Sequence, residues 1–210
     1  MVIRIGNLLG WVTLSAGLLC LFSGSAGDGQ AAPAIVQTHT YRFTACIKVN
    51  AGITPLKVGE TIKGTFTYDL HGENLRPDVR GLGRYRSKRN ALSFQYGDLR
   101  FKGVGDISAS VTKLDNSEHF GVVAPDLDLP EGWEMDHKEG SQTYALILQN
   151  APTKEVIRNT KLPKSLSLSD FIDTRELRLD FFHGVRFPGG QVEDRATVHA
   201  IVETLEEIDP

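Results

Sequence analysis

Apolar and polar side chains alternate with a period of two over most of the chain from Thr38 onward. The segments 38–49 and 61–70 both alternate in this way, which is typical of half-buried strands. In the segment 92–102, two such runs flank Gly97-Asp98, and this pattern predicts a hairpin. Five further strands are predicted at 107–114, 120–123, 143–149, 176–182 and 196–205.

These short strands, separated by clusters of Gly, Pro, Asn and Asp, predict an all-β fold. We expect about eight strands in two antiparallel sheets that pack as a jelly-roll-like β-sandwich. The only helical signal is one turn at 168–172, where Ser169 is a candidate cap. The alternation also predicts that Val49 points into the core and that Cys46 points outward with the polar side chains. No linker or internal repeat divides residues 38–210, so we expect them to form a single domain.

The N-terminus has a different pattern. Arg4 precedes an uncharged apolar run at 8–22, which is short for a membrane-spanning helix but fits the apolar region of a secretory signal peptide. The small residues Gly24 and Ala26 occupy the positions that a signal peptidase requires to be small. We therefore expect residues 1–26 to be a signal peptide that is cleaved after Ala26.

The same region offers other cleavage positions and bears on whether the product carries a lipid. Cleavage after Ala31 or Ala32 is an alternative. Leu19 stands directly before Cys20, and this argues against a lipidated cysteine, which needs a small residue before it. Residues 27–37 are then a flexible N-terminal segment, and the product is expected to be secreted or periplasmic.

The net charge narrows the choice of binding partners. The chain has a formal net charge of −3, and loss of Arg4 with the signal would make it −4. A mildly acidic protein gives no reason to expect nucleic acid or an anionic membrane as a partner.

Cys46 would be the only cysteine of the mature protein, so an internal disulfide is excluded. Its thiol is open to three roles: a reactive group, intermolecular pairing, or a small inert side chain.

Several segments carry a resemblance to a known group of proteins. They are Val58–Asp69, Pro77-Asp78, Gly83–Tyr85, Leu92–Phe94, Leu166–Phe171, Leu177–Leu179 and Val198–Leu205. In this order they resemble exported bacterial proteins of the PEP-CTERM type, and the resemblance implies an exported β-domain without assigned catalytic residues. The group usually ends in a Pro-Glu-Pro-like tripeptide, an apolar helix and a basic tail, whereas this chain ends in Glu203–Pro210. We therefore expect a soluble product without a surface anchor.

The stretch Asp126–Asp136 is the most acidic part of the chain. Its alternating carboxylates are oxygen ligands of the kind that Ca²⁺ prefers, although the EF-hand spacing is absent and a solvated loop explains them as well. Trp133 lies in the same stretch. An exposed ring beside carboxylates is a candidate platform for stacking a sugar, and the alternative is a ring that folds back over a sheet edge.

Other candidates for binding or catalytic sites are basic, histidine and carboxylate side chains. A basic cluster is formed by Arg76, Arg80, Arg84, Arg86, Lys88 and Arg89, which either receives an anionic partner or is a solvated loop. The histidines are His39, His71, His119, His137, His183 and His199, and no pair has the spacing of a helical zinc site. Asp170 and Asp173 form a carboxylate pair that a cap and a turn also explain.

Three functions remain open from the sequence. The leading hypothesis is a non-catalytic exported domain that binds an extracellular or envelope component, either polysaccharide or protein, without a cofactor. The second is a secreted hydrolase with a carboxylate-based site. The third is a structural component of an extracellular matrix.

Overall fold

Antiparallel strands make up most of the structure. The computed structural model describes residues 37–52, 55–135, 142–150, 157–181, 185–190, 192–193 and 195–208. These residues belong to one compact unit that covers positions 35–210. The predicted signal peptide and the 27–37 segment up to residue 36 lie outside the described residues.

The strands follow one another along the chain with short connections. They are β1 (Thr38–Ala51), β2 (Thr61–Asp69), β3 (Glu73–Asn74), β4 (Leu82–Arg86), β5 (Ala91–Tyr96), β6 (Leu99–Val104), β7 (Ser108–Leu114), β8 (Ser117–Ala124), β9 (Asp126–Asp128), β10 (Glu134–Met135), β11 (Gln142–Asn150), β12 (Thr174–Phe181), β13 (Val185–Arg186), β14 (Val192–Glu193) and β15 (Ala196–Ile208). Within the described residues, twelve of them form one sheet in the order β3-β4-β7-β8-β11-β12-β15-β1-β2-β5-β6-β9. The strands β10, β13 and β14 form a small separate sheet.

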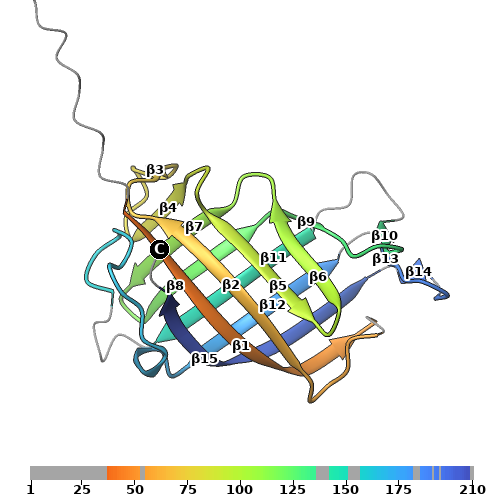
Figure 1. Cartoon of the computed structure of the whole chain (residues 1–210). Helices are drawn as coiled ribbons and strands as arrows, with labels where there is room; N and C mark the ends of the chain where they lie inside the picture. Colours follow the sequence, from red (N-terminus) through yellow and green to blue (C-terminus); the bar gives the residue numbers. More distant parts are fainter. Residues whose placement is uncertain are drawn as a thin grey trace, which may run out of the picture. The chain divides into compact units, whose positions relative to one another are not determined.

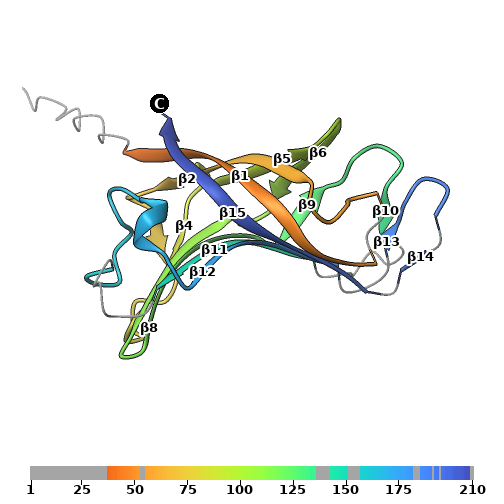
Figure 2. The same ribbon diagram turned by 90° about the horizontal axis from the view of Figure 1, so that it is seen from below.

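The prediction of an all-β, antiparallel fold is confirmed. The prediction of two packed sheets with about eight strands is not, because twelve strands share one continuous ladder of hydrogen bonds. Figure 1 shows this sheet curling on itself, so that β1, β2, β5 and β6 cross in front of β8, β11 and β12. The view from below in Figure 2 shows the same two halves facing each other.

Aromatic side chains fill the space between the two halves. Phe66 and Tyr68 on β2 face Phe120 on β8, with ring centroids 6.1 Å and 5.2 Å away from the ring of Phe120. Tyr41 on β1 stacks on Phe66 at 5.2 Å. All four side chains are fully buried. The residues of β1 and β2 that alternate with them therefore face outward, as the period of a strand requires.

Two glycines allow the strands to approach closely where the sheet curls. Gly103 on β6 lies against β8, because a Cβ atom at Gly103 would be 2.8 Å from the Cβ of Ala124. Gly64 on β2 pairs with Phe43 on β1, and the ring of Phe43 fills the space that a side chain at Gly64 would occupy. Glycine inside a strand often marks such a close approach.

Irregular pairing between β1 and β15 changes the expected orientation of Val49. The register shifts between Thr44 and Ala45 and again between Ile47 and Val49, which is the signature of β-bulges. Beyond the second shift Val49 is 48% exposed, so the prediction that it points into the core is wrong. Cys46 alternates with Ala45 and Ile47, which belong to the core, so it lies on the outward face as predicted; it is nevertheless buried, and the Nζ of Lys48 lies 3.2 Å from its Sγ.

Residues 157–173, which we call the strap, cross one end of the curled sheet without forming strands. Ile157, Leu162 and Phe171 are buried in the core. The strap contains η2 (Leu168–Asp170), a single 3-10 turn at the position of the predicted helical turn. Its N-cap residue is Ser167 and not the predicted Ser169, and no side chain caps it.

Replacing Phe120 by Ala tests the contact between the two halves of the sheet. Because this ring is fully buried against Phe66 and Tyr68, we expect Phe120→Ala to lower the free energy of unfolding by about 3–5 kcal/mol. Leu114→Ala, at a position 50% exposed on the neighbouring β7, should change it by less than about 0.5 kcal/mol. Denaturant unfolding followed by fluorescence measures both values. Equal losses in the two variants would contradict the packing described.

Candidate functional site

An open groove lies over the strands β1, β2, β5, β6 and β9 and has a volume of about 1080 Å³. It is also bordered by the turn between β4 and β5, which contains Lys88 and Arg89. Along β2 and β6 the charged lining residues Lys63 and Lys102 are exposed, whereas the apolar residues beside them are buried. The groove therefore lies on the outward face of the half-sheet whose inward face carries the aromatic core.

The register of the strands arranges the outward side chains of the groove in two rows. The first row crosses five strands and contains Arg42, Thr65, Ser93, Lys102 and Asp128. The second row contains Lys63, Gln95 and Arg100. Polar uncharged side chains thus occupy the middle of the groove, with cations on the strands at either side.

The lining of the groove is strongly cationic although the chain as a whole is acidic. Six cations line it, namely Arg42, Lys63, Lys88, Arg89, Arg100 and Lys102, and Asp128 is the one carboxylate in its lining. Arg42 pairs with Glu206 at 3.0 Å, and Arg89 pairs with Asp69 at 3.3 Å. The other four cations have no ion pair within the described part of the chain. They remain free to contact an anion.

Buried polar side chains hold the turn that borders one end of the groove. Asn90 is buried; its Oδ1 accepts from the backbone N–H of Asp69, and its Nδ2 donates to the carbonyls of Tyr85 and Ile107. The carboxylate of Asp69 accepts from the hydroxyl of Ser87 at 2.9 Å. These bonds fix the backbone on both sides of Lys88 and Arg89, so both cations are presented to the groove from a rigid turn.

Asp69 is ionised in this environment. Burial acts to raise its pKa, but hydrogen bonds from the backbone of His71 and from Ser87 and Arg89, together with the charge of Arg89, lower the pKa below its ordinary value of 3.8. A carboxylate with several donors keeps its charge even where little solvent reaches it.

The pH dependence of stability tests this arrangement. Because folding lowers the pKa of Asp69, its contribution to stability is complete above about pH 4 and is lost as the pH falls through the lower pKa of the folded state. We expect Asp69→Asn to be less stable than the wild type at pH 6, and the difference should shrink toward pH 2. Denaturant unfolding at several pH values measures it. A difference that stays constant with pH would contradict the ionised, hydrogen-bonded carboxylate.

The acidic stretch does not form the sugar-stacking platform proposed from the sequence. Trp133 is buried, and its ring meets Phe101 at 5.4 Å and Phe187 at 4.5 Å in edge-to-face geometry. The sugar-stacking platform is therefore wrong, and the alternative of a ring folded back onto the sheet is confirmed. Asp126 and Asp128 lie on β9, while Asp136 lies outside the described residues.

The predicted basic cluster is divided between different contacts. Arg86 pairs with Glu73 at 3.0 Å and with Asp106 at 3.1 Å, and Arg84 donates to the hydroxyl of Ser108. Arg76 and Arg80 are exposed and do not line the groove. Of the six basic residues in this cluster, only Lys88 and Arg89 reach the groove.

The carboxylates that are buried among the described residues have structural partners. Three buried carboxylates, Asp69, Glu118 and Asp180, each contact a cation, respectively Arg89, Lys113 and Arg178. Within the part of the chain that the structure describes, no group of three His, Cys, Asp or Glu side chains could hold a metal ion. Asp170 lies in the 3-10 turn, and Asp173 is exposed just before β12.

The histidines are dispersed in the structure as well. His199 on β15 pairs with Glu176 on β12, and its neighbours Val198 and Ala200 are buried, as the alternation predicts. Burial lowers the pKa of His119 on β8. His71 is exposed beside β2, and His137 and His183 lie outside the described residues.

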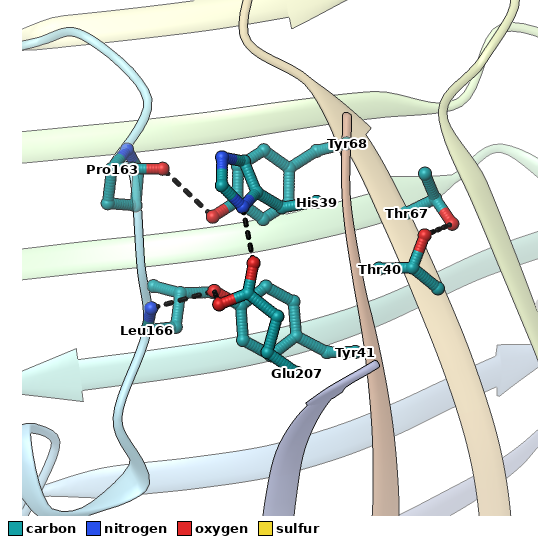
Figure 3. A network of polar contacts seen from close by, with 8 residues as sticks. All are labelled: His39, Thr40, Tyr41, Thr67, Tyr68, Pro163, Leu166 and Glu207. Carbon is teal, nitrogen blue, oxygen red and sulfur yellow. Dashed lines mark hydrogen bonds and ion pairs between the residues drawn. The ribbon is translucent and has the colours of Figure 1, made fainter. Parts of the chain in front are cut away.

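A second polar network joins the strap to the ends of β1, β2 and β15 (Figure 3). The hydroxyl of Tyr41 accepts from the backbone N–H of Leu166 at 2.9 Å and donates to Glu207 at 3.2 Å. The hydroxyl of Tyr68 donates to the carbonyl of Pro163 at 2.9 Å. Burial raises the pKa of both phenols, so both stay protonated at neutral pH. The same Glu207 contacts the Nδ1 of His39 at 2.5 Å.

This network is structural in character, since it supplies partners to backbone groups that are removed from water. Other bonds act in the same way along the strap. Tyr85 donates to the carbonyl of Thr160, Lys113 donates to that of Ile157, and Glu118 accepts from the N–H of Ile157.

Hydrogen exchange at Leu166 tests the strap contact. Tyr41→Phe removes the acceptor of the Leu166 amide, so this amide should exchange at least about tenfold faster, as expected for loss of a bond worth about 1.4 kcal/mol. Tyr68→Phe is the matched control, because it removes a hydroxyl that binds the carbonyl of Pro163 instead. Exchange at Leu166 that is equally fast in both variants would contradict this assignment.

Sequence reasoning missed most of the groove. Lys63, Arg100 and Lys102 occupy polar positions of the alternating strands, but they are far apart in the sequence or separated by a buried residue. The sequence does show cations at the outward positions of β2 and β6. They can be assigned to one groove only when β2 is known to pair with β5 and β5 with β6.

Compared with models of known protein families, with curated proteins and with solved structures, the chain shows no significant match. None of the helices in the described residues has the length and apolar character of a membrane span.

Proposed function

We propose that this chain is an exported, non-catalytic domain that binds an anionic extracellular or envelope component in the groove over β1, β2, β5, β6 and β9. The observation that carries the proposal is the charge of the lining: six cations and one carboxylate, in a chain whose net charge is −3. Export rests on the signal-peptide pattern of residues 1–26 and on the resemblance to exported bacterial proteins of the PEP-CTERM type.

Electrostatics supports an anionic ligand in particular. Lys63 lies on β2, and Arg100 and Lys102 lie on β6, with only β5 between the two strands. All three are exposed and have no carboxylate partner in the described structure. Like charges held this close repel one another, and an anion that bridges them relieves the repulsion. Arginine adds paired donors that match the two oxygens of a carboxylate or a phosphate.

The buried carboxylates give the hydrolase alternative no support. A hydrolase of this kind needs two carboxylates in a cleft, one of them kept protonated by its surroundings. The only carboxylate in the lining of the groove is the exposed Asp128, and the three carboxylates that are buried among the described residues each contact a cation. The structural-matrix alternative predicts self-association, which sedimentation of the purified protein would reveal.

Binding of soluble polyanions tests the proposal. The purified protein should bind polygalacturonate or inorganic polyphosphate at low salt but not neutral dextran. Binding should weaken strongly near 1 M salt, where the screening length falls to roughly 3 Å. Calorimetry or affinity electrophoresis measures the dissociation constants.

A matched pair of variants locates the binding site. The triple variant Lys63→Gln, Arg100→Gln and Lys102→Gln should weaken binding about tenfold or more, since three surface charge contacts contribute about 0.5 kcal/mol or more each. The control is Arg158→Gln, Lys161→Gln and Lys164→Gln, which removes the same charges from exposed positions of the strap outside the groove. Equal weakening by both triples would refute the groove as the binding site, and no binding of either polyanion would refute the proposed function.

A further inference from the structure

The middle of the groove is polar and uncharged, which restricts the chemistry of the anion that fits it. Thr65 and Ser93 are direct neighbours on β2 and β5, and their hydroxyl oxygens lie 2.9 Å apart. The exposed amide of Gln95 lies two residues further along β5. The aromatic residues in the lining, Phe94 and Phe101, are buried on the other face of the strands. In the middle of the two rows an occupant therefore meets hydroxyl and amide groups, beside the apolar lining residues Ala91 and Leu129, and no exposed aromatic ring.

The rows of side chains run across the strands. At about 4.8 Å per strand, the first row separates Arg42 from Lys102 by about 14 Å along the sheet, with Thr65 and Ser93 between them. The second row separates Lys63 from Arg100 by about 10 Å, with Gln95 between them. A chain lying across the strands meets a cation, then hydroxyl or amide groups, then a second cation.

The carboxylate of Asp128 indicates that the ligand carries hydrogen-bond donors as well as negative charge. It ends the first row on β9, directly beside Lys102, but it is exposed and forms no ion pair within the described residues. A free carboxylate at the edge of a cationic groove repels any anion and accepts hydrogen bonds only from a donor. Polyphosphate has no such donor at neutral pH. A polysaccharide that bears carboxylates also bears hydroxyls, and these donate to Asp128 and to the amide oxygen of Gln95.

We infer that the ligand of the groove is an acidic polysaccharide that lies across the strands; this inference rests on the proposed function. The anionic groups of the polysaccharide contact the flanking cations, and its hydroxyls contact Thr65, Ser93, Gln95 and Asp128. The polar middle and the free carboxylate give selectivity for sugars over other polyanions. The cations supply attraction, and the uncharged row supplies directional hydrogen bonds.

The sign of the effect of Asp128→Asn tests the inference. If Asp128 accepts hydrogen bonds from sugar hydroxyls, the variant binds polygalacturonate about threefold or more weakly, while it binds polyphosphate more tightly because a repelling charge is gone. Asp98→Asn is the matched control: Asp98 is exposed in the turn between β5 and β6 and does not line the groove. It should change the two dissociation constants slightly and in the same direction.

The outcomes separate the inference from the proposed function. Opposite changes for the two polymers in Asp128→Asn support an acidic polysaccharide as the ligand. A change of the same sign for both, or no change for either, overturns the inference and leaves the anion-binding groove intact. Failure of the wild-type protein to bind either polymer refutes the proposed function itself.

Discussion

Packing of the aromatic side chains of β1 and β2 against β8 holds the two halves of the curled sheet together. Tyr41, Phe66, Tyr68 and Phe120 form one contiguous buried group, and their removal from water supplies a large hydrophobic contribution. Because side chains of a strand alternate between its faces, the same packing fixes which residues point outward. The cations of the groove are therefore placed by the core on the opposite side of the strands.

Closing a curled sheet leaves an open end, and the strap fills it with irregular backbone. Such backbone can be buried only if its N–H and C=O groups find partners. The inward side chains of Tyr41, Tyr68, Tyr85 and Glu118 supply them. Asp69 and Asn90 do the same for the turn that carries Lys88 and Arg89. Buried polar residues in the described part of the chain thus act mainly on the backbone.

The sequence predicted the strands well because half-buried strands have a clear period of two, as in β2 and β15. It failed at Val49, where a β-bulge shifts the alternation, and at Trp133, whose contacts with Phe101 and Phe187 come from distant segments. The single curled sheet was not predictable from local pattern, since strand order depends on long-range pairing. The groove was missed for the same reason: four of its six cations come from β1, β2 and β6, and only Lys88 and Arg89 of the basic cluster reach it.

The central claim is that the outward face of β2, β5 and β6 binds an acidic polysaccharide. Mapping of backbone amide chemical shifts during titration with short oligogalacturonates tests it most directly. The shifts should concentrate at Lys63, Thr65, Ser93 and Lys102 and leave the strap unchanged. Shifts that concentrate on the strap, or around Arg76 and Arg80, would contradict the claim.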